Sequence, residues 1–296
     1  MSDDLSFGAK LDNWRSTPYS KWAFHHVREI VPTADIENKS GLVNNLSLDI
    51  QRFEDLNLEL VMEETETDAI VIAQNNSILF EKYNNGMSEK SPHILFSVSK
   101  SILGLIVGAL IGNKTLNESD LIIKFVPELK MTAYSDATVR DLLDMRVGVK
   151  FDEDYTATTG PIINYRYAAN WNPVPVGVEA GDLKSFMGSL TERDGIHNDR
   201  FHYVSPNTDL LAWVCERASG IRYSDLISEL LWTPLGAESS GYITVDRLGG
   251  MRAAGGVCFT ARDLARVGLM IGNYGYANNK QIIPDFWIDD IIKNGS

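Results

Sequence analysis

The sequence feature that most constrains the fold is an apolar run from Ile102 to Gly112. The run is too short to cross a membrane, because a spanning helix needs about 20 apolar residues. It predicts a buried helix that begins near Ser97 and ends at Gly112. Three glycines, at positions 104, 108 and 112, recur every four residues along one face of that helix. An interior glycine costs a helix about 1 kcal/mol relative to alanine. This face therefore predicts close approach of another backbone, in a central helix held between layers.

Composition and charge restrict the partners that the chain can bind. The 296 residues are 44% hydrophobic and 23% charged, as in a globular protein with a sizeable core in one large domain or two modest ones. The formal net charge of -13 comes from 40 acidic and 27 basic residues, with no evident cluster of Lys and Arg. Since binding to phosphates needs such clusters, nucleic acid is not an expected partner.

Cysteines, histidines and the N-terminus indicate the chemical setting. Cys215 and Cys258 each lie in an apolar segment, which predicts two buried free thiols. The five histidines show no metal-ligand spacing, so we expect neither a metal nor a cofactor. The acidic N-terminus lacks the apolar core of a secretory signal, and we expect a cytoplasmic protein with no membrane partner. The sequence leaves a homodimer open.

The remaining patterns predict one hairpin followed mainly by helices. Residues 69–83 alternate in polarity on both sides of Asn75-Asn76, which predicts a β-hairpin. Residues 151–181, with several prolines, glycines and aromatic residues, predict a long loop. Helices are predicted over 139–145, 207–219, 223–232 and 261–271, the first capped by Thr138.

These elements suggest three regions. Residues 1–66 form an irregular N-terminal segment that wraps the body of the protein. Residues 67–125 and 231–296 form an α/β region with an incomplete sheet, and residues 126–230 form a mainly helical region. A single hairpin is not stable alone, so further strands must join it.

A serine and a lysine at the start of the predicted central helix suggest catalytic chemistry. Ser97 and Lys100 are three residues apart, and residues at this spacing are neighbours on a helix surface. A serine hydroxyl needs an adjacent base to act as a nucleophile. Lysine can be that base when burial lowers its pKa, and the flanking apolar residues would supply such a setting. A helix start, with Ser97 as cap and Lys100 solvated, is the alternative. Ser99 and Ser101 have no lysine three positions on, which makes Ser97 the candidate.

Tyr203-Val204-Ser205 is a second motif, 106 residues after Ser97 and just before a predicted helix. A tyrosine in this place can carry its phenol into a pocket. The alternative is a core aromatic residue whose hydroxyl finds any available partner.

Taken together, these motifs form an ordered series. The series runs through Phe96-Ser-Val-Ser-Lys-Ser101, Thr138-Val-Arg-Asp-Leu-Leu-Asp-Met145, Tyr203-Val-Ser205 and Ala253-Ala-Gly-Gly-Val-Cys-Phe-Thr-Ala-Arg-Asp-Leu-Ala-Arg266. It resembles the serine hydrolases related to class C β-lactamases and penicillin-binding proteins, and within them the 6-aminohexanoate-dimer (nylon-oligomer) hydrolases. Segments 22–29, 31–33 and 67–70 match the N-terminal region of that subgroup. The resemblance implies an α/β (α+β) fold, with an antiparallel sheet flanked by helices and an additional helical region.

The resemblance also implies roles for individual residues. Ser97 would be the acylated nucleophile, Lys100 would accept its proton, and Tyr203 would relay protons to the leaving group. Ser205 stands where class C lactamases have asparagine, which argues against efficient β-lactam hydrolysis and fits the esterase and amidase members. Tyr155 matches a loop tyrosine that contacts substrate, although an exposed loop aromatic residue is the alternative. The neighbouring run Asp152-Glu-Asp154 is expected to be solvated, and a rim that selects cationic substrate ends is the alternative.

One family motif has no counterpart in the expected place. The family carries a Lys/His-Thr/Ser-Gly motif or a tryptophan variant on a strand beyond the position of Arg266, and that strand supplies an oxyanion-hole donor. No such motif follows Arg266, and Lys39-Ser40-Gly41 lies in the wrong order, before the nucleophile. We expect the sequence to be a C-terminal truncation. It should be poorly active, because loss of one oxyanion donor lowers a rate by about 10²–10³. It should also be prone to aggregate, because unpaired strand edges template aggregation.

The sequence therefore favours a serine hydrolase that cleaves a small-molecule ester or linear amide through an acyl-enzyme. One alternative is a D-alanyl peptidase or β-lactamase. Another is a non-catalytic relative that binds a ligand in the same cleft, which the missing motif supports.

Overall fold

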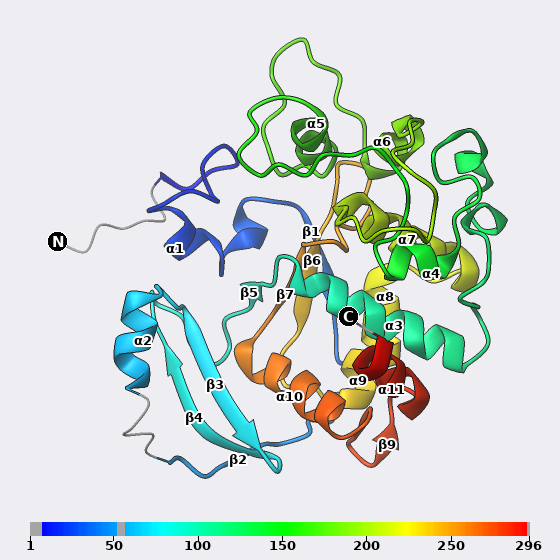
Figure 1. Cartoon of the computed structure of the whole chain (residues 1–296). Helices are drawn as coiled ribbons and strands as arrows, with labels where there is room; N and C mark the ends of the chain where they lie inside the picture. The colour runs from blue at the N-terminus through cyan, green and yellow to red at the C-terminus, as the bar shows by residue number, and fades with distance from the viewer. Residues whose placement is uncertain (1–7, 52–56, 295–296) are drawn as a thin grey trace.

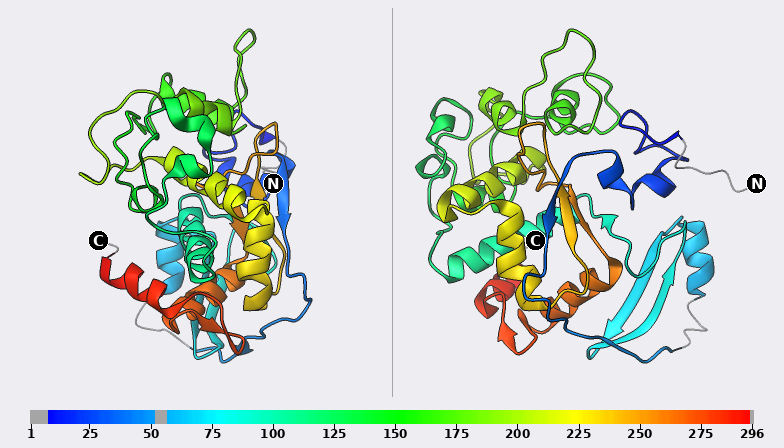
Figure 2. Two further views of the ribbon diagram at one scale, coloured as in Figure 1. Left: turned by 90° about the vertical axis from the view of Figure 1, so that its right-hand side faces the viewer. Right: turned by 180° about the vertical axis from the view of Figure 1, so that it is seen from behind.

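The computed structural model describes residues 8–51 and 57–294. The acidic N-terminus, which contains Asp3 and Asp4, lies outside the described residues. A four-stranded antiparallel sheet in strand order β1-β6-β7-β5 lies at the centre of the molecule (Figures 1 and 2). Its strands are β1 (Thr33–Ile36), β6 (Gly241–Thr244), β7 (Val257–Phe259) and β5 (His93–Ile94).

A second sheet stands to one side of the first. It has the order β2-β4-β3, formed by β2 (Ser47–Leu48), β4 (Ser77–Tyr83) and β3 (Ala69–Gln74). Figure 1 shows it at the lower left, with α2 (Leu58–Glu64) on its outer side and α10 (Ala261–Gly272) between it and the body. The predicted hairpin over 69–83 is confirmed. Asn75 and Asn76 both have positive φ, as a two-residue hairpin turn requires.

The predicted central helix is confirmed as α3 (Val98–Gly112), which packs against α7 (Ser205–Ser219). The prediction that another backbone packs on its glycine face was wrong, because side chains pack there. A Cβ at Gly108 would lie 2.1 Å from the Trp287 ring, and a Cβ at Gly112 would lie 2.4 Å from Pro284. Trp287 lies on α11 (Asp285–Asn294) and donates its ring N–H to the Gly104 carbonyl at 2.9 Å. The close approach is therefore made by side chains at α11, and not by another backbone.

The helical region lies in the upper and right-hand part of Figure 1. Thr138 caps its first helix with a capping box to Asp141, as expected for a helix that begins at 139. The helix predicted from 207 begins two residues earlier, at Ser205. The helices of this region are α4 (Val139–Leu143), α5 (Pro161–Ala168), α6 (Leu183–Ser189) and α7.

The remaining helices and strands are short. The predicted helix over 223–232 is present as two consecutive segments, and the helix predicted from 261 is α10. The other elements are α1 (Ser20–Ala23), η2 (Val27–Glu29), η4 (Ile122–Lys124), η5 (Pro127–Met131), α8 (Tyr223–Ile227), η6 (Ser228–Trp232), α9 (Thr233–Leu235), β8 (Tyr276–Ala277) and β9 (Lys280–Gln281).

Two sequence interpretations were wrong. The segment 1–66 is not irregular throughout, because Thr33–Ile36 forms an edge strand that pairs with β6. The segment 151–181 is not one loop, because it contains α5. Pro161 occupies the first turn of that helix, where proline is tolerated, and residues such as Ile162 and Tyr165 bury its inner face.

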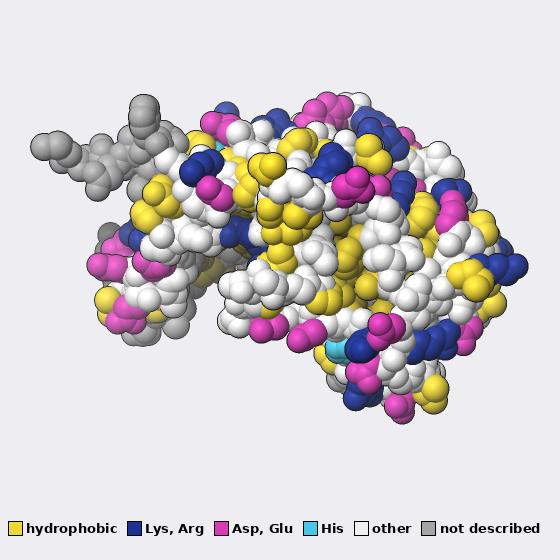
Figure 3. All heavy atoms as spheres, turned by 90° about the horizontal axis from the view of Figure 1, so that it is seen from above, with side chains coloured by type: hydrophobic (Ala, Val, Ile, Leu, Met, Phe, Trp, Pro, Cys, Tyr) yellow, Lys and Arg dark blue, Asp and Glu magenta, His cyan; other side chains and the backbone are white. Residues whose placement is uncertain are grey.

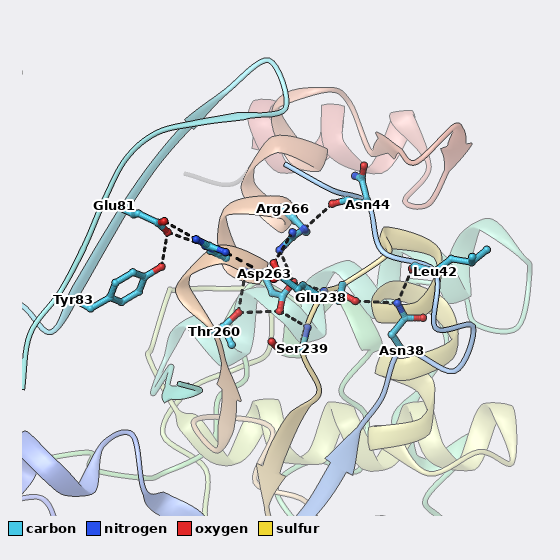
Figure 4. Close-up of polar contacts among 12 residues, drawn as sticks. Asn38, Leu42, Asn44, Glu81, Tyr83, Glu238, Ser239, Thr260, Asp263 and Arg266 are labelled. Carbon is cyan, nitrogen blue, oxygen red and sulfur yellow. Dashed lines mark hydrogen bonds and ion pairs between the residues drawn. The ribbon is translucent and has the colours of Figure 1, made fainter. Parts of the chain in front are cut away.

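A buried polar network fastens the second sheet and the N-terminal segment to α10 (Figure 4). Asp263 accepts hydrogen bonds from the backbone N–H groups of Glu238 and Ser239, at 2.8 and 3.0 Å. Arg266 donates to the Asn44 carbonyl, and Arg262 forms a two-point ion pair with Glu81 of β4. Segments far apart in the sequence are thus joined at one helix.

Two further expectations concern thiols and membranes. Cys215 and Cys258 are free and buried, as predicted. Across residues 8–51 and 57–294, no helix is both long and apolar enough to span a bilayer.

Candidate active site

Ser97 lies exposed at the N-terminus of α3, directly after a residue with an unusual backbone conformation. Phe96 has φ +43°, in the left-handed region that non-glycine residues rarely adopt. Three rings surround the Phe96 ring, those of Trp14, Phe24 and Trp171, with centroids 5.0–6.4 Å away. The surrounding structure therefore holds a conformation that costs of order 1–3 kcal/mol, as is common at functional sites.

Lys100 lies one turn further along the same helix and reaches back to Ser97. Its Nζ is 3.1 Å from the Ser97 Oγ and donates a hydrogen bond to the Ala254 carbonyl at 2.7 Å. Burial lowers the pKa of Lys100 below its ordinary value, and a hydrogen bond with Tyr203 opposes this only in part. The structure does not support the alternative of a solvated first-turn lysine.

Tyr203 lies just before α7 and completes a compact group of three side chains. Its hydroxyl is 2.6 Å from the Ser97 Oγ, and the Lys100 Nζ lies 4.8 Å from the centre of its ring. The neighbouring backbone is held in place by a hydrogen bond from the His202 N–H to the Met145 carbonyl. Tyr203 is thus not simply a core aromatic residue, since its hydroxyl is paired with the candidate nucleophile.

Ser205 and Tyr155 are both joined to a residue that the sequence interpretation set aside. The Glu153 carboxylate accepts hydrogen bonds from the Ser205 N–H at 2.6 Å, the Ser205 Oγ at 2.5 Å and the Tyr155 hydroxyl at 2.6 Å. The expectation that 152–154 is a solvated run was therefore wrong for Glu153, which is half-buried. Tyr155 itself is 61% exposed, and partial burial together with Glu153 raises the pKa of its phenol.

A buried ion pair supports the segment that holds Lys100. Asp209 of α7 pairs with Arg252, and both contact the Tyr165 hydroxyl. The second Asp209 oxygen accepts the Ala254 N–H at 2.7 Å, and the carbonyl of the same residue accepts Lys100. The sequence interpretation missed Asp209 and Arg252, because their pairing across 43 residues leaves no local pattern.

The remaining candidates lie apart from this group. The Ser99 Oγ is buried and accepts the Val257 N–H at 3.2 Å. Lys39 of the Lys39-Ser40-Gly41 segment pairs with Asp225 and Glu229 on the surface and contacts none of the site residues. No group of three or more potential metal-ligating side chains occurs in the part of the chain that the structure describes.

Comparisons with known proteins identify the family. The family model described as Beta-lactamase matches residues 57–286, most of the chain. The protein belongs to the β-lactamase family, and it is a hydrolase of that family with the β-lactamase and penicillin-binding-protein fold.

Individual relatives refine the comparison. The 6-aminohexanoate-dimer hydrolase of Paenarthrobacter ureafaciens is 35% identical over 291 residues, which are 97% of this chain and 73% of the relative. A solved structure from Bacillus anthracis, assigned as a 6-aminohexanoate-dimer hydrolase, has a TM-score of 0.89 and 26% identity, covering 97% of this chain and 77% of that one. A β-lactamase/D-alanine carboxypeptidase from Pseudomonas syringae shares the fold, with a TM-score of 0.58 and 17% identity over 80% of this chain and 68% of that one.

Proposed function

We propose that this protein is a serine hydrolase that cleaves an ester or linear amide bond through an acyl-enzyme on Ser97. The observation that carries the proposal is the position of the Ser97 Oγ, within hydrogen-bond distance of both the Lys100 Nζ and the Tyr203 hydroxyl. A nucleophile beside its base, with that base oriented by a third group, is the arrangement that nucleophilic catalysis needs.

The chemistry would proceed in two halves. Neutral Lys100 accepts the Ser97 proton as the oxygen attacks the substrate carbonyl, and Tyr203 passes a proton to the departing alcohol or amine. Water then hydrolyses the acyl-enzyme by the reverse proton route. The Ser97 N–H, at the start of α3, has no intramolecular acceptor among the described residues and can donate to the developing oxyanion. The positive end of the helix dipole favours the same negative charge.

Two observations favour a linear ester or amide over a β-lactam or a D-alanyl peptide. Ser205 occupies the position that the resemblance assigns to asparagine in class C lactamases, and its hydroxyl is bound to Glu153. A relative with 35% identity is named for the hydrolysis of 6-aminohexanoate dimer, a linear amide.

A covalent serine probe tests the nucleophile. A fluorophosphonate is expected to add one probe to the wild-type protein, and Ser97→Ala is expected to abolish both this labelling and the hydrolysis of a p-nitrophenyl ester. Ser101→Ala is the matched control, since Ser101 is exposed on the same helix and has no role in the proposal. Intact-mass spectrometry measures the labelling. A folded Ser97→Ala protein that still takes up the probe would remove Ser97 from the mechanism, and an unlabelled wild type would favour a ligand-binding relative.

The pH dependence of the reaction tests the state of Lys100. The base must be neutral, so kcat/KM is expected to rise with pH as Lys100 loses its proton. Because burial lowers the pKa of Lys100, the midpoint of this rise should lie below the ordinary lysine pKa of about 10.4. Initial rates with a p-nitrophenyl ester from about pH 5 to about pH 10, corrected for spontaneous hydrolysis, measure it. A rate that does not change across this range would contradict a lysine base.

A further inference from the structure

Two arginines lie over the Trp171 ring, beside the candidate active site, and a third lies close to them. The guanidinium carbons of Arg15 and Arg252 lie 5.8 and 4.9 Å from the centre of the Trp171 ring. Arg166 of α5 accepts the backbone N–H of Trp171 at its carbonyl, at 2.9 Å, and its side chain donates to the Tyr155 carbonyl. The charge of Arg166 is near enough to Arg15 to act on its pKa.

Among the residues that the structure describes, only Arg252 of these three arginines has a carboxylate partner. Arg252 is paired with the buried Asp209. Within the described residues, Arg15 and Arg166 form no ion pair. The first donates to the Asn172 side chain, and the second donates to the Tyr155 carbonyl at 3.2 Å. The Nε of Arg15 is buried and has no hydrogen-bond partner in the described structure. In the described part of the chain, two half-buried guanidinium groups are therefore left without a carboxylate in direct contact.

The described carboxylates near Arg15 and Arg166 accept hydrogen bonds from other groups. Asp154 lies near enough to feel the charge of Arg166, but its Oδ1 accepts hydrogen bonds from the N–H and the hydroxyl of Thr156. Glu153 is held by Ser205 and Tyr155. Burial, followed by the charges of Arg166 and Arg252, lowers the pKa of Arg15 to about 10. A bound anion would offset both the burial of this charge and its repulsion by the neighbouring guanidinium groups.

The unpaired arginines connect directly to the site. The Trp171 ring packs on Phe96, the residue before Ser97, with the ring centres 6.0 Å apart. Arg166 holds the backbone of Tyr155, whose hydroxyl joins the Glu153–Ser205 pair. Figure 3 shows positive and negative side chains interspersed around an apolar middle on the face seen from above, and the chain carries a net charge of -13. An anion would therefore be bound by these guanidinium groups and not by a broad positive field.

We propose that Arg15 and Arg166 form an anion subsite that binds a carboxylate carried by the ester or amide substrate. This proposal rests on the proposed hydrolase function, whose substrate it specifies further. A guanidinium group presents donors in a planar fork that matches the two oxygens of a carboxylate.

Matched substrate pairs test the subsite at both ends of the scissile bond. In the first pair, mono(4-nitrophenyl) adipate carries a carboxylate on its acyl group, and 4-nitrophenyl hexanoate is its uncharged counterpart. In the second pair, 4-acetoxybenzoate carries a carboxylate on its leaving group, and 4-acetoxybenzamide is its uncharged counterpart. In at least one pair, Arg166→Gln and Arg15→Gln are each expected to lower kcat/KM for the carboxylate member by about 10-fold or more, while the uncharged member stays within about twofold. Arg247→Gln is the control, because this exposed arginine donates only to backbone carbonyls and has no carboxylate partner among the described residues.

The uncharged substrates separate a lost subsite from a damaged fold. Equal losses for both members of every pair, or no loss for either, would overturn the subsite. A binding measurement does not need turnover. Calorimetry compares the affinity for 4-acetoxybenzoate of Ser97→Ala with that of Ser97→Ala combined with Arg166→Gln. Binding that depends on Arg166 in a protein that cleaves none of the four esters would support the subsite and contradict the hydrolase function alone. Binding that is absent, or that does not change with Arg166, would contradict the subsite.

Discussion

Lys100→Met is expected to lower kcat for a p-nitrophenyl ester by about 10²–10⁴, the usual contribution of a general base. Methionine keeps the length and the apolar contacts of the buried stem but cannot accept the Ser97 proton. It also gives up the hydrogen bond to the Ala254 carbonyl. Because burial already disfavours the charged form of Lys100, the variant should fold at least as well as the wild type.

Two further variants make this expectation specific. Lys100→Arg keeps a donor for Ala254 but stays protonated, so it should be as inactive as Lys100→Met. Lys130→Met removes an exposed lysine and should leave the rate unchanged. Steady-state kinetics, with circular dichroism to confirm folding, measure all three. A folded Lys100→Met protein within about threefold of the wild-type rate would rule out Lys100 as the base.

Asp209→Ala is expected to lower the free energy of unfolding by about 3–5 kcal/mol, because it leaves the buried guanidinium of Arg252 without its counter-charge. The Ala254 N–H loses its acceptor in the same change. Asp225→Ala is the matched control, since the exposed pair of Asp225 with Lys39 should contribute about 0–1 kcal/mol. Urea denaturation followed by tryptophan fluorescence measures both.

A double variant separates the two roles of this ion pair. Asp209→Leu combined with Arg252→Met removes both charges, and such replacements are often neutral or stabilising. We expect it to recover stability relative to Asp209→Ala but not activity, because the Ala254 segment that holds Lys100 stays without its anchor. A destabilisation by Asp209→Ala of less than about 1 kcal/mol would show that Arg252 is compensated in another way.

Local patterns predicted those parts of the fold that depend on neighbouring residues. The hairpin over 69–83 follows from its alternation and its Asn75-Asn76 turn, and the helix from 98 follows from its apolar run. Edge strand β1 has only four residues and depends on β6, more than 200 positions away, so no local pattern marks it. Helix α5 was missed because proline and glycine were taken as loop residues, although Pro161 is at a helix start.

The same distinction applies to the candidate site. Ser97 and Lys100 share one helical turn, so their spacing alone predicts that they lie close together. Tyr203 was identified through the ordered motifs, and the structure brings its hydroxyl to Ser97. Glu153, Asp209 and Arg252 were missed because their contacts join separate segments. A carboxylate two residues before Tyr155 was visible in the sequence, but nothing local distinguishes it from a solvated acid.

The aromatic rings around Phe96 tie the start of the chain to the reactive serine. Trp14 and Phe24 come from the N-terminal segment, yet they press on the ring of the residue that bends the backbone into Ser97. Variants that remove these ring contacts would allow Phe96 to relax toward an ordinary conformation. Substitutions at positions 14 and 24 would then alter turnover without touching the substrate, although the loss of the fully buried Trp14 would also lower thermal stability.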